Sequence, residues 1–162
     1  LPFAFAMLMP PFKGVDFVAH SPKLHATAKD YIKVNDSYQH TEYPFIWAAG
    51  IAVDVVAPFT PGKVPFGVPK TGFPADEEGK VVAENIIRLS EGQTELVEKP
   101  FGKIPGLCVM DAGKKEVLII SNHLFKPRQF AVMLPNVFYD VGKRMFEKYF
   151  LWKTVHGYSF LP

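Results

Sequence analysis

FEKYFLWK, at residues 146–153, is the most informative stretch of this chain. It lies within residues 137–152, where apolar side chains recur every three or four positions, a spacing that predicts an amphipathic helix. The apolar positions are Val141, Met145, Phe146, Tyr149, Phe150 and Trp152. The sequence leaves two interpretations of the aromatic side chains open: ordinary core, or the walls of a flat apolar ligand site.

A second helix is expected upstream, over residues 74–89. Pro74 suits the first helical turn, and the acidic side chains that follow it lie near the positive end of the helix dipole. Three apolar residues recur at the spacing of one helical face: Val82, Ile86 and Leu89. Gly92 is expected to end this helix.

Several apolar runs predict strands. Residues 3–9 indicate a buried strand that Pro10 ends, and residues 30–34 alternate as a short strand does. Residues 45–49 run into Gly50, which is typical of a parallel strand that delivers backbone to a ligand. Two further runs, 107–111 and 116–121, flank AGKK (112–115) and predict a β-hairpin. The expected fold class is therefore α/β, with parallel strands, a β-hairpin and a C-terminal amphipathic helix.

The composition limits the kinds of partner. Hydrophobic residues make up 48% of the chain and 15 are Phe, which suggests extra apolar surface against other protein or a membrane. No apolar run reaches the roughly 18 residues that span a bilayer, so the membrane contact to expect is peripheral. The net charge of +2, without a basic tract, gives nucleic acid no support as a partner.

Metal and acid–base sites find little support in the sequence. The five histidines and the single cysteine form neither a His-x-x-x-His nor a Cys-x-x-Cys spacing, so no metal is expected. Asp76, Glu77 and Glu78 are more simply a charge cluster at a helix start than an acid–base pair. The phosphate-binding pattern Gly-x-Gly-x-x-Gly is also absent from the sequence.

Four stretches, taken in order and at their intervals, carry a family resemblance: PPFKG (10–14), WAAGIA (47–52), GVPKTG (67–72) and FEKYFLWK (146–153). Together they resemble the C-terminal half of sulfide:quinone oxidoreductases, flavoproteins of the two-dinucleotide-binding-domain superfamily. The fold implied is the C-terminal half of a double Rossmann-like flavoprotein. Many flavoenzymes of this superfamily have Asp where this chain has Ile51, a departure that weighs against a standard disulfide reductase.

The resemblance also implies a division of the chain. Residues 1–42 would end the second dinucleotide-binding-like domain, residues 43–92 would belong to the FAD-binding domain, and residues 93–162 would face quinone or membrane. Because no Gly-x-Gly-x-x-Gly is present, the FAD site within this chain is expected to be incomplete. The start on Leu1 favours a fragment, for which the missing N-terminal half is the expected partner.

Cys108 is the catalytic candidate. A lone cysteine is by default a small apolar residue in a strand, and no intrachain disulfide is possible. The family, however, has a Cys-[Ile/Val]-x-Asp run at this point, and CVMD begins at Cys108, 38 residues after Lys70. The resemblance implies that Cys108 pairs with a cysteine of the missing half and carries the growing sulfur chain, as a thiolate or persulfide.

The resemblance assigns flavin contacts to the turn after residues 45–49 and to the loop before the helix of residues 74–89: Gly50, Ile51, Ala52, Lys70, Thr71 and Gly72. A glycine before a helix start lets backbone N–H groups approach an anionic ligand closely, which suits the negative edge of reduced flavin. The quinone contacts that it implies are Lys70, Lys143, Phe146 and Phe150. Without the resemblance, GVPKTG is a loop that leads into a helix, and Lys143 is a solvated helix lysine.

The implied activity is oxidation of sulfide to polysulfide or elemental sulfur, with FAD as cofactor and a quinone as acceptor. This chain alone is expected to be inactive, and the intact enzyme is expected at a membrane surface whose side the sequence leaves open. Two alternatives remain at this point. One is a type II NADH:quinone dehydrogenase, which has no need of Cys108, and the other is a non-catalytic docking fragment.

Overall fold

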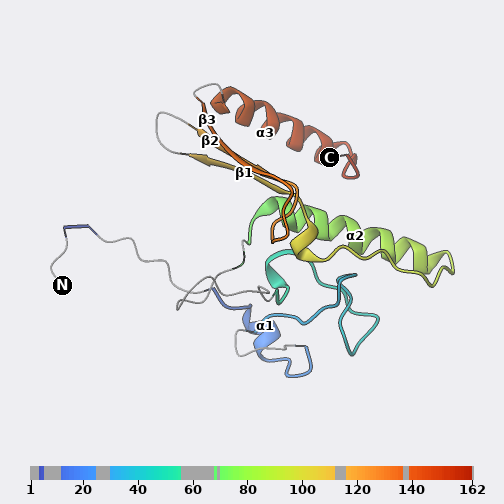
Figure 1. Ribbon diagram of the computed structural model, residues 1–162. Coiled ribbons are helices and arrows are strands. Elements are labelled where there is room, and N and C mark those ends of the chain that lie inside the picture. Colours follow the sequence, from blue (N-terminus) through green and yellow to red (C-terminus); the bar gives the residue numbers. More distant parts are fainter. Residues whose placement is uncertain are drawn as a thin grey trace.

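A computed structural model describes residues 4–5, 12–24, 30–55, 68, 70–111, 116–136 and 139–161. The elements are the helices α1 (Asp16–Ala19), α2 (Gly72–Ser90) and α3 (Tyr139–Val155), the 3-10 turns η1 (Gly50–Ala52) and η2 (Phe101–Lys103), and the strands β1 (Gly106–Asp111), β2 (Glu116–Ser121) and β3 (Ala131–Asn136). Figure 1 shows α3 along one side of the sheet, while α2 lies on the other side, near one end of the strands. The expected strand over residues 3–9 and the turn 112–115 fall outside the described residues.

Helix α2 confirms the helix predicted over residues 74–89, with Pro74 in its first turn. It ends where Gly92 takes a φ of +79°, a left-handed conformation that suits glycine. The predicted apolar face is wrong, since Ile86 and Leu89 are exposed. The buried side chains lie one position away and include two polar ones: Pro74, Glu78, Val81 and Asn85.

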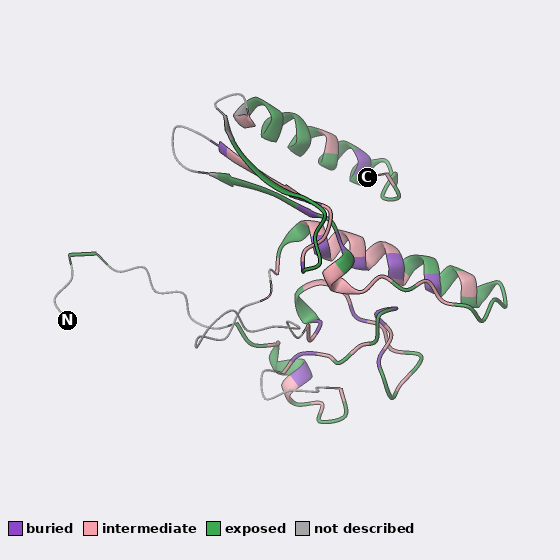
Figure 2. Cartoon of the chain, viewed as in Figure 1, coloured by how far each residue is buried: buried purple, intermediate pink, exposed green. Residues whose placement is uncertain are grey.

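The core lies between α2 and the irregular segment that precedes it. Four buried residues form its centre: Tyr38, Ala48, Val53 and Val81. Asn85, which is fully buried, ties the helix to two backbone segments, since its amide donates to the carbonyls of Ser37 and Val97 and accepts from the Val97 N–H. In Figure 2 the buried residues concentrate here, whereas β1, β3 and α3 are mostly exposed.

The three-stranded sheet has the order β1-β2-β3 and is antiparallel throughout. The predicted hairpin is confirmed, but the parallel strands do not occur among the described residues beyond a single bridge between Ile32 and Val53. Residues 45–49 contribute only a bridge between Trp47 and Gln39, so the strand predicted there is wrong. The expected strand over residues 30–34 is likewise reduced to isolated bridges.

Strand β3 was not expected from the sequence. It pairs with β2 through its whole length, and its Pro135 lies opposite Val117. A proline cannot donate a hydrogen bond, so it is tolerated here because β3 is an edge strand of the sheet.

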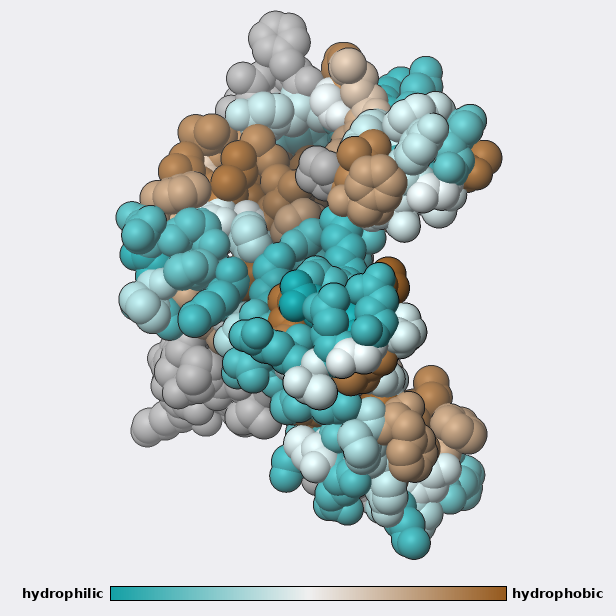
Figure 3. All heavy atoms as spheres, turned by 90° about the vertical axis from the view of Figure 1, so that its right-hand side faces the viewer, coloured by the Kyte–Doolittle hydropathy of each residue, from teal (hydrophilic) through white to brown (hydrophobic). Residues whose placement is uncertain are grey.

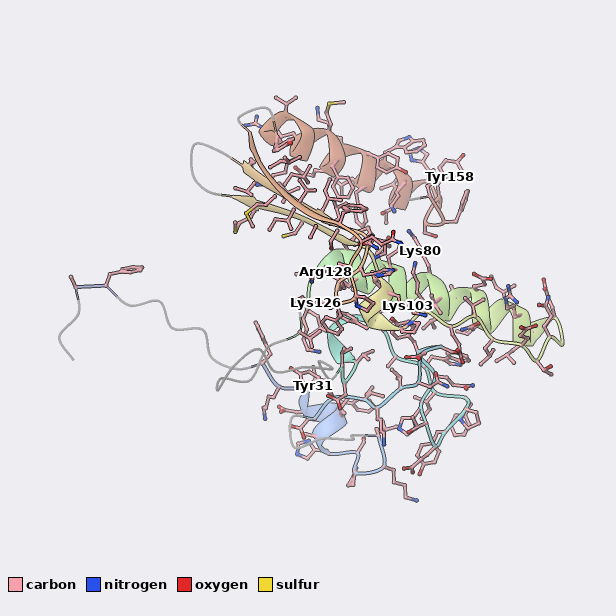
Figure 4. The ribbon with its side chains drawn as sticks, in the orientation of Figure 1. Tyr31, Lys80, Lys103, Lys126, Arg128 and Tyr158 are labelled. Carbon is pink, nitrogen blue, oxygen red and sulfur yellow. The ribbon has the colours of Figure 1, made fainter. Side chains whose placement is uncertain are left out.

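Helix α3 confirms the predicted C-terminal helix and extends it to Val155. Its buried Lys153 lies 3.6 Å from Asp76 of α2 and donates to the carbonyl of Leu161. Lys80 also pairs with Asp76, and in Figure 4 it projects from α2 toward the end of α3. Among the described residues, no helix is long and apolar enough to cross a membrane.

Candidate functional site

The η1 turn lies directly against α2. Gly50 has a φ of +71°, and a Cβ built on it would lie 3.1 Å from the Cβ of Ala75. The left-handed conformation therefore requires glycine, and the close approach to Ala75 also favours it. The two residues that follow, Ile51 and Ala52, are exposed, although their carbonyl oxygens accept hydrogen bonds from the Lys70 ammonium and the Ile32 N–H.

Glu78 of α2 binds the backbone of this turn. Its carboxylate accepts a hydrogen bond from the backbone N–H of Gly50, and the residue is 1% exposed. Burial raises the pKa of Glu78 to about 7, against the lowering effects of the Gly50 N–H and of the nearby Lys70. The sequence assigned Glu78 only to a charge cluster at the helix start, whereas the structure gives it a specific backbone partner.

Lys70 binds the carbonyl oxygens of the same turn. Its ammonium donates to the carbonyl oxygens of Ile51, at 3.0 Å, and Val53, at 2.9 Å. The ammonium also lies 4.0 Å from the centre of the Tyr31 ring, which Figure 4 places near α1 and the turn. In this structure the contacts of Lys70 therefore fix the backbone that was expected to bind flavin.

The start of α2 is open. Thr71 precedes the helix without a side-chain cap, and both Thr71 and Gly72 are exposed. Among the described residues, nothing lies within 4 Å of a Cβ built on Gly72, which leaves room for a ligand to approach the backbone. Uncapped N–H groups at a helix start favour an anionic ligand edge. Together with the neighbouring η1 turn, this surface fits a group such as the FAD that the sequence implies.

A second site lies between the sheet and α3. It is a cavity of about 370 Å³ and its lining is almost wholly apolar. The lining residues are Phe73, Leu107, Val109, Leu118, Tyr139, Gly142, Lys143 and Phe146. In Figure 3 the apolar side chains gather on the upper part of the molecule, the level of the sheet and α3. A small planar apolar molecule is the kind of ligand that such a cavity accommodates.

Lys143 is the charged residue of this lining, and its partner comes from the sheet. Its ammonium lies 3.2 Å from the Oε1 atom of Glu116, the first residue of β2. Glu116 is buried and Lys143 is about half exposed. The ion pair therefore places a cation at the wall of an apolar cavity, where it can meet an oxygen of a bound ligand.

The predicted quinone residues divide between two places. Lys143 and Phe146 line the cavity, as expected of a shared site. Lys70 does not line it, because its ammonium is bonded to the η1 turn. Phe150 is also absent from the lining; its ring lies 6.2 Å from that of Phe146 and faces the Lys153 ammonium.

Cys108 is exposed and lies on the other face of the sheet from the cavity. Its strand neighbours Leu107 and Val109 both line the cavity, and successive strand residues point to opposite faces. Ile119 pairs with Cys108 across the sheet, and Met133 follows on β3. The thiol and the cavity are therefore separated by the thickness of one sheet.

The sequence interpretation missed much of the cavity wall. Phe73, Leu107, Val109 and Leu118 line it but were not among the predicted site residues. A signal was present, since strand alternation places Leu107, Val109 and Leu118 on one face once Leu118 is paired with Val109. Glu116 carried no such signal, because a glutamate at the start of a strand usually lies in solvent.

Comparison with known proteins supports the resemblance seen in the sequence. No protein-family model matches the chain. The chain is 29% identical over 158 residues to the sulfide-quinone reductase of Aquifex aeolicus (strain VF5). The aligned region covers 97% of this chain and 36% of that protein. The X-ray structure of the sulfide:quinone oxidoreductase from the hyperthermophilic bacterium Aquifex aeolicus matches 97% of this chain and 36% of its own, with a TM-score of 0.84 and 28% identity.

The resemblance to sulfide:quinone oxidoreductases is thereby confirmed, and the fold mixes helices and strands as that of the Aquifex aeolicus structure does. The chain spans about a third of the length of these relatives.

Proposed function

We propose that this chain is part of an FAD-dependent oxidoreductase that oxidises sulfide to polysulfide or elemental sulfur and reduces a quinone. The observation that carries the proposal is the structural match to a sulfide:quinone oxidoreductase over 97% of this chain. The similarity in sequence to a sulfide-quinone reductase over the same share supports it. The names of both matched proteins contain sulfide and quinone. This favours sulfide oxidation with quinone reduction over NADH oxidation or a purely docking role.

In this proposal FAD binds across the η1 turn and the start of α2. The exposed residues Ile51, Ala52, Thr71 and Gly72 would face it, while Lys70 and Gly50 shape the turn. FAD supplies the two-electron chemistry that links sulfide oxidation to quinone reduction. Because no Gly-x-Gly-x-x-Gly pattern occurs in this sequence, the phosphate-binding part would, in this proposal, lie outside these 162 residues.

The quinone head group would occupy the cavity beneath α3. Phe146 and Phe73 supply flat apolar surface, and the Lys143 ammonium would donate a hydrogen bond to a quinone carbonyl oxygen. Phe150 extends the aromatic surface outside the cavity. Lys70, which was also expected at the quinone, would act on it only through the backbone that it holds.

Cys108 would carry sulfur on the opposite face of the sheet. Its exposure leaves the thiol accessible to a partner cysteine from the remaining part of the enzyme. Sulfide would attack the bridge between the two cysteines, one S–S bond would break as a new one forms, and the released thiolate would keep the electron pair. Sulfide chemistry and quinone binding would then take place on separate faces of one sheet.

The membrane contact would be peripheral and would use the outer side of α3. Met145, Leu151 and Val155 are all exposed there, and Tyr158 and Phe160 follow the helix. Apolar side chains on the outside of an amphipathic helix suit burial at a membrane surface.

The domain boundaries stay a prediction. Residues 30–42 are joined to the following segment by the Ile32–Val53 bridge and by the bond from the Lys99 N–H to the Asp36 carbonyl. A division at residue 42 would therefore separate two domains that share backbone hydrogen bonds.

The test uses the intact protein that carries this chain, loaded with FAD and kept anaerobic. Addition of sulfide should bleach the oxidised flavin absorbance, and a short-chain ubiquinone should restore it. Cys108→Ser should lose the bleaching, whereas Met133→Ser, an exposed position on the same sheet face, should keep it. Bleaching by NADH but not by sulfide would replace the proposal with a dehydrogenase, and a protein that binds no flavin would favour the docking role.

A further inference from the structure

Glu116 is a buried acid that the proposed function does not yet use. The residue is 6% exposed, and its Oε1 atom lies 3.2 Å from the ammonium of Lys143. Its other oxygen, Oε2, is also buried and has no hydrogen-bond partner within the part of the chain that the structure describes. A buried carboxylate oxygen without a partner is unfavourable, and in native structures such a group is often one that serves a function.

The position of Glu116 relates that role to the cavity. Glu116 and Leu118 are two residues apart on β2, so both side chains project from the same face of the sheet. Leu118 lines the cavity, as does Lys143 from the facing helix. The carboxylate therefore stands beside the cavity wall and contacts its one lysine without itself being part of the lining.

A lysine ammonium such as that of Lys143 must be held by a partner if it is to donate a hydrogen bond from one defined position. The ammonium sits on a flexible four-carbon stem, and Lys143 is about half exposed, so solvent competes for it. A buried carboxylate at 3.2 Å limits the positions that the ammonium can take. Because β2 is the central strand of the sheet, the anchor itself is held on a rigid element.

We propose that Glu116 is a positioning residue for quinone: it holds the Lys143 ammonium at the cavity wall, so that the ammonium can donate to a quinone carbonyl oxygen. This inference rests on the proposed function, because it takes quinone as the occupant of the cavity. Glu116 does not touch the quinone, and it acts through Lys143 alone.

The experiment is a double-mutant cycle on quinone binding by the intact, FAD-loaded protein. The dissociation constant of a short-chain ubiquinone is measured for wild type, Glu116→Gln, Lys143→Gln and the double variant. Glu116→Gln should weaken binding about tenfold, the loss expected for one charge-assisted contact, and Glu116→Asp should fall between it and wild type. The matched control is Glu147→Gln, an exposed carboxylate on α3, which should bind quinone as wild type does.

The cycle distinguishes positioning from general support of the fold. If Glu116 acts through Lys143, the double variant should bind no more weakly than Lys143→Gln, and flavin bleaching by sulfide should keep its wild-type rate. Independent, additive losses would overturn the proposal, as would wild-type quinone binding in Glu116→Gln. If Glu116→Gln does not fold, Glu116→Asp decides in the same way: weaker binding supports the proposal, and unchanged binding overturns it.

A failure of the proposed function would look different. A wild-type protein that does not bind the quinone would remove the quinone assignment and this inference together. A wild-type protein that binds it, with both Glu116 variants unchanged, would remove only the inference.

Discussion

The carboxylate of Glu78 accepts a hydrogen bond from the backbone N–H of Gly50, across the contact between α2 and the η1 turn. Glu78 is 1% exposed, and Gly50 takes the left-handed conformation that the turn requires. The bond connects the interior of the helix to the backbone that was expected to bind flavin. It also places a group with a pKa raised to about 7 next to that backbone, so the turn should respond to pH.

The first prediction concerns stability and pH. Burial raises the pKa of folded Glu78 from 4.5 to about 7. The stability that protonated Glu78 contributes is therefore fully present below pH 4.5 and is lost as the pH rises toward 7. The free energy of unfolding should fall by roughly 3 to 4 kcal/mol over that window, at about 1.4 kcal/mol for each pKa unit. Glu78→Gln keeps an oxygen acceptor for Gly50 and should flatten this part of the profile.

The measurement is thermal unfolding of the intact protein from pH 4.5 to 8, for Glu78→Gln and for Glu84→Gln. Glu84 is exposed on the same helix, so its variant should retain the wild-type slope. An unchanged slope in Glu78→Gln would show that other groups cause the pH dependence.

The second prediction concerns Lys70. Lys70→Met removes two hydrogen bonds from the ammonium to the turn, to Ile51 and Val53, together with the contact to the Tyr31 ring. We expect FAD to bind about tenfold more weakly, because the turn is less well ordered before the cofactor arrives. The dissociation constant of FAD is measured by titration of the apoprotein, with Lys33→Met, an exposed lysine, as the control. FAD binding as tight as in wild type would show that Glu78 alone holds the turn.

The sequence predicted the elements whose signals are local. Both long helices and the hairpin follow from apolar spacing, a first-turn proline and a short polar turn, and all three are found close to the expected positions. The run 45–49 has the composition of a buried strand, yet it forms only a single bridge at Trp47. Burial of Ala48 against Tyr38 and Val81 explains its apolar character without a sheet.

Of the cavity lining, the sequence could place together only residues that are close in the chain. Lys143 and Phe146 are three residues apart on one helix, so a helical pattern places them together. The pairing of Lys143 with Glu116, 27 residues away, depends on how α3 packs on the sheet, which no local pattern encodes. Lys70 was expected at the quinone, but its ammonium lies against backbone carbonyls, whose positions the sequence does not show.

The third prediction concerns Asn85. Its amide makes three hydrogen bonds to the backbone of Ser37 and Val97, and the residue is fully buried. Asn85→Ala leaves those backbone groups without this partner, so the free energy of unfolding should fall by about 2 to 4 kcal/mol. Chemical denaturation of the intact protein measures the loss, and Glu84→Ala on the exposed side of α2 should change it by less than about 1 kcal/mol. A loss as small as that of the control would mean that water replaces the amide.

The fourth prediction tests the cavity by filling it. Gly142 of α3 lines the cavity, and a Cβ built on it meets no atom of the described residues within 4 Å. Gly142→Leu should therefore place a side chain in the open space and weaken the binding of a short-chain ubiquinone by more than tenfold. The fold should tolerate the change, since leucine favours a helix over glycine by roughly 0.5 to 1 kcal/mol.

Gly79→Leu is the matched control, because Gly79 also lies within a helix, α2, with open space where its Cβ would be. It lines no part of the cavity beneath α3, so quinone binding should stay at the wild-type level. Equal losses in both variants would indicate a general disturbance of the protein. Undiminished binding in Gly142→Leu would place the quinone elsewhere, and the assignment of Lys143 and Phe146 to it would then be withdrawn.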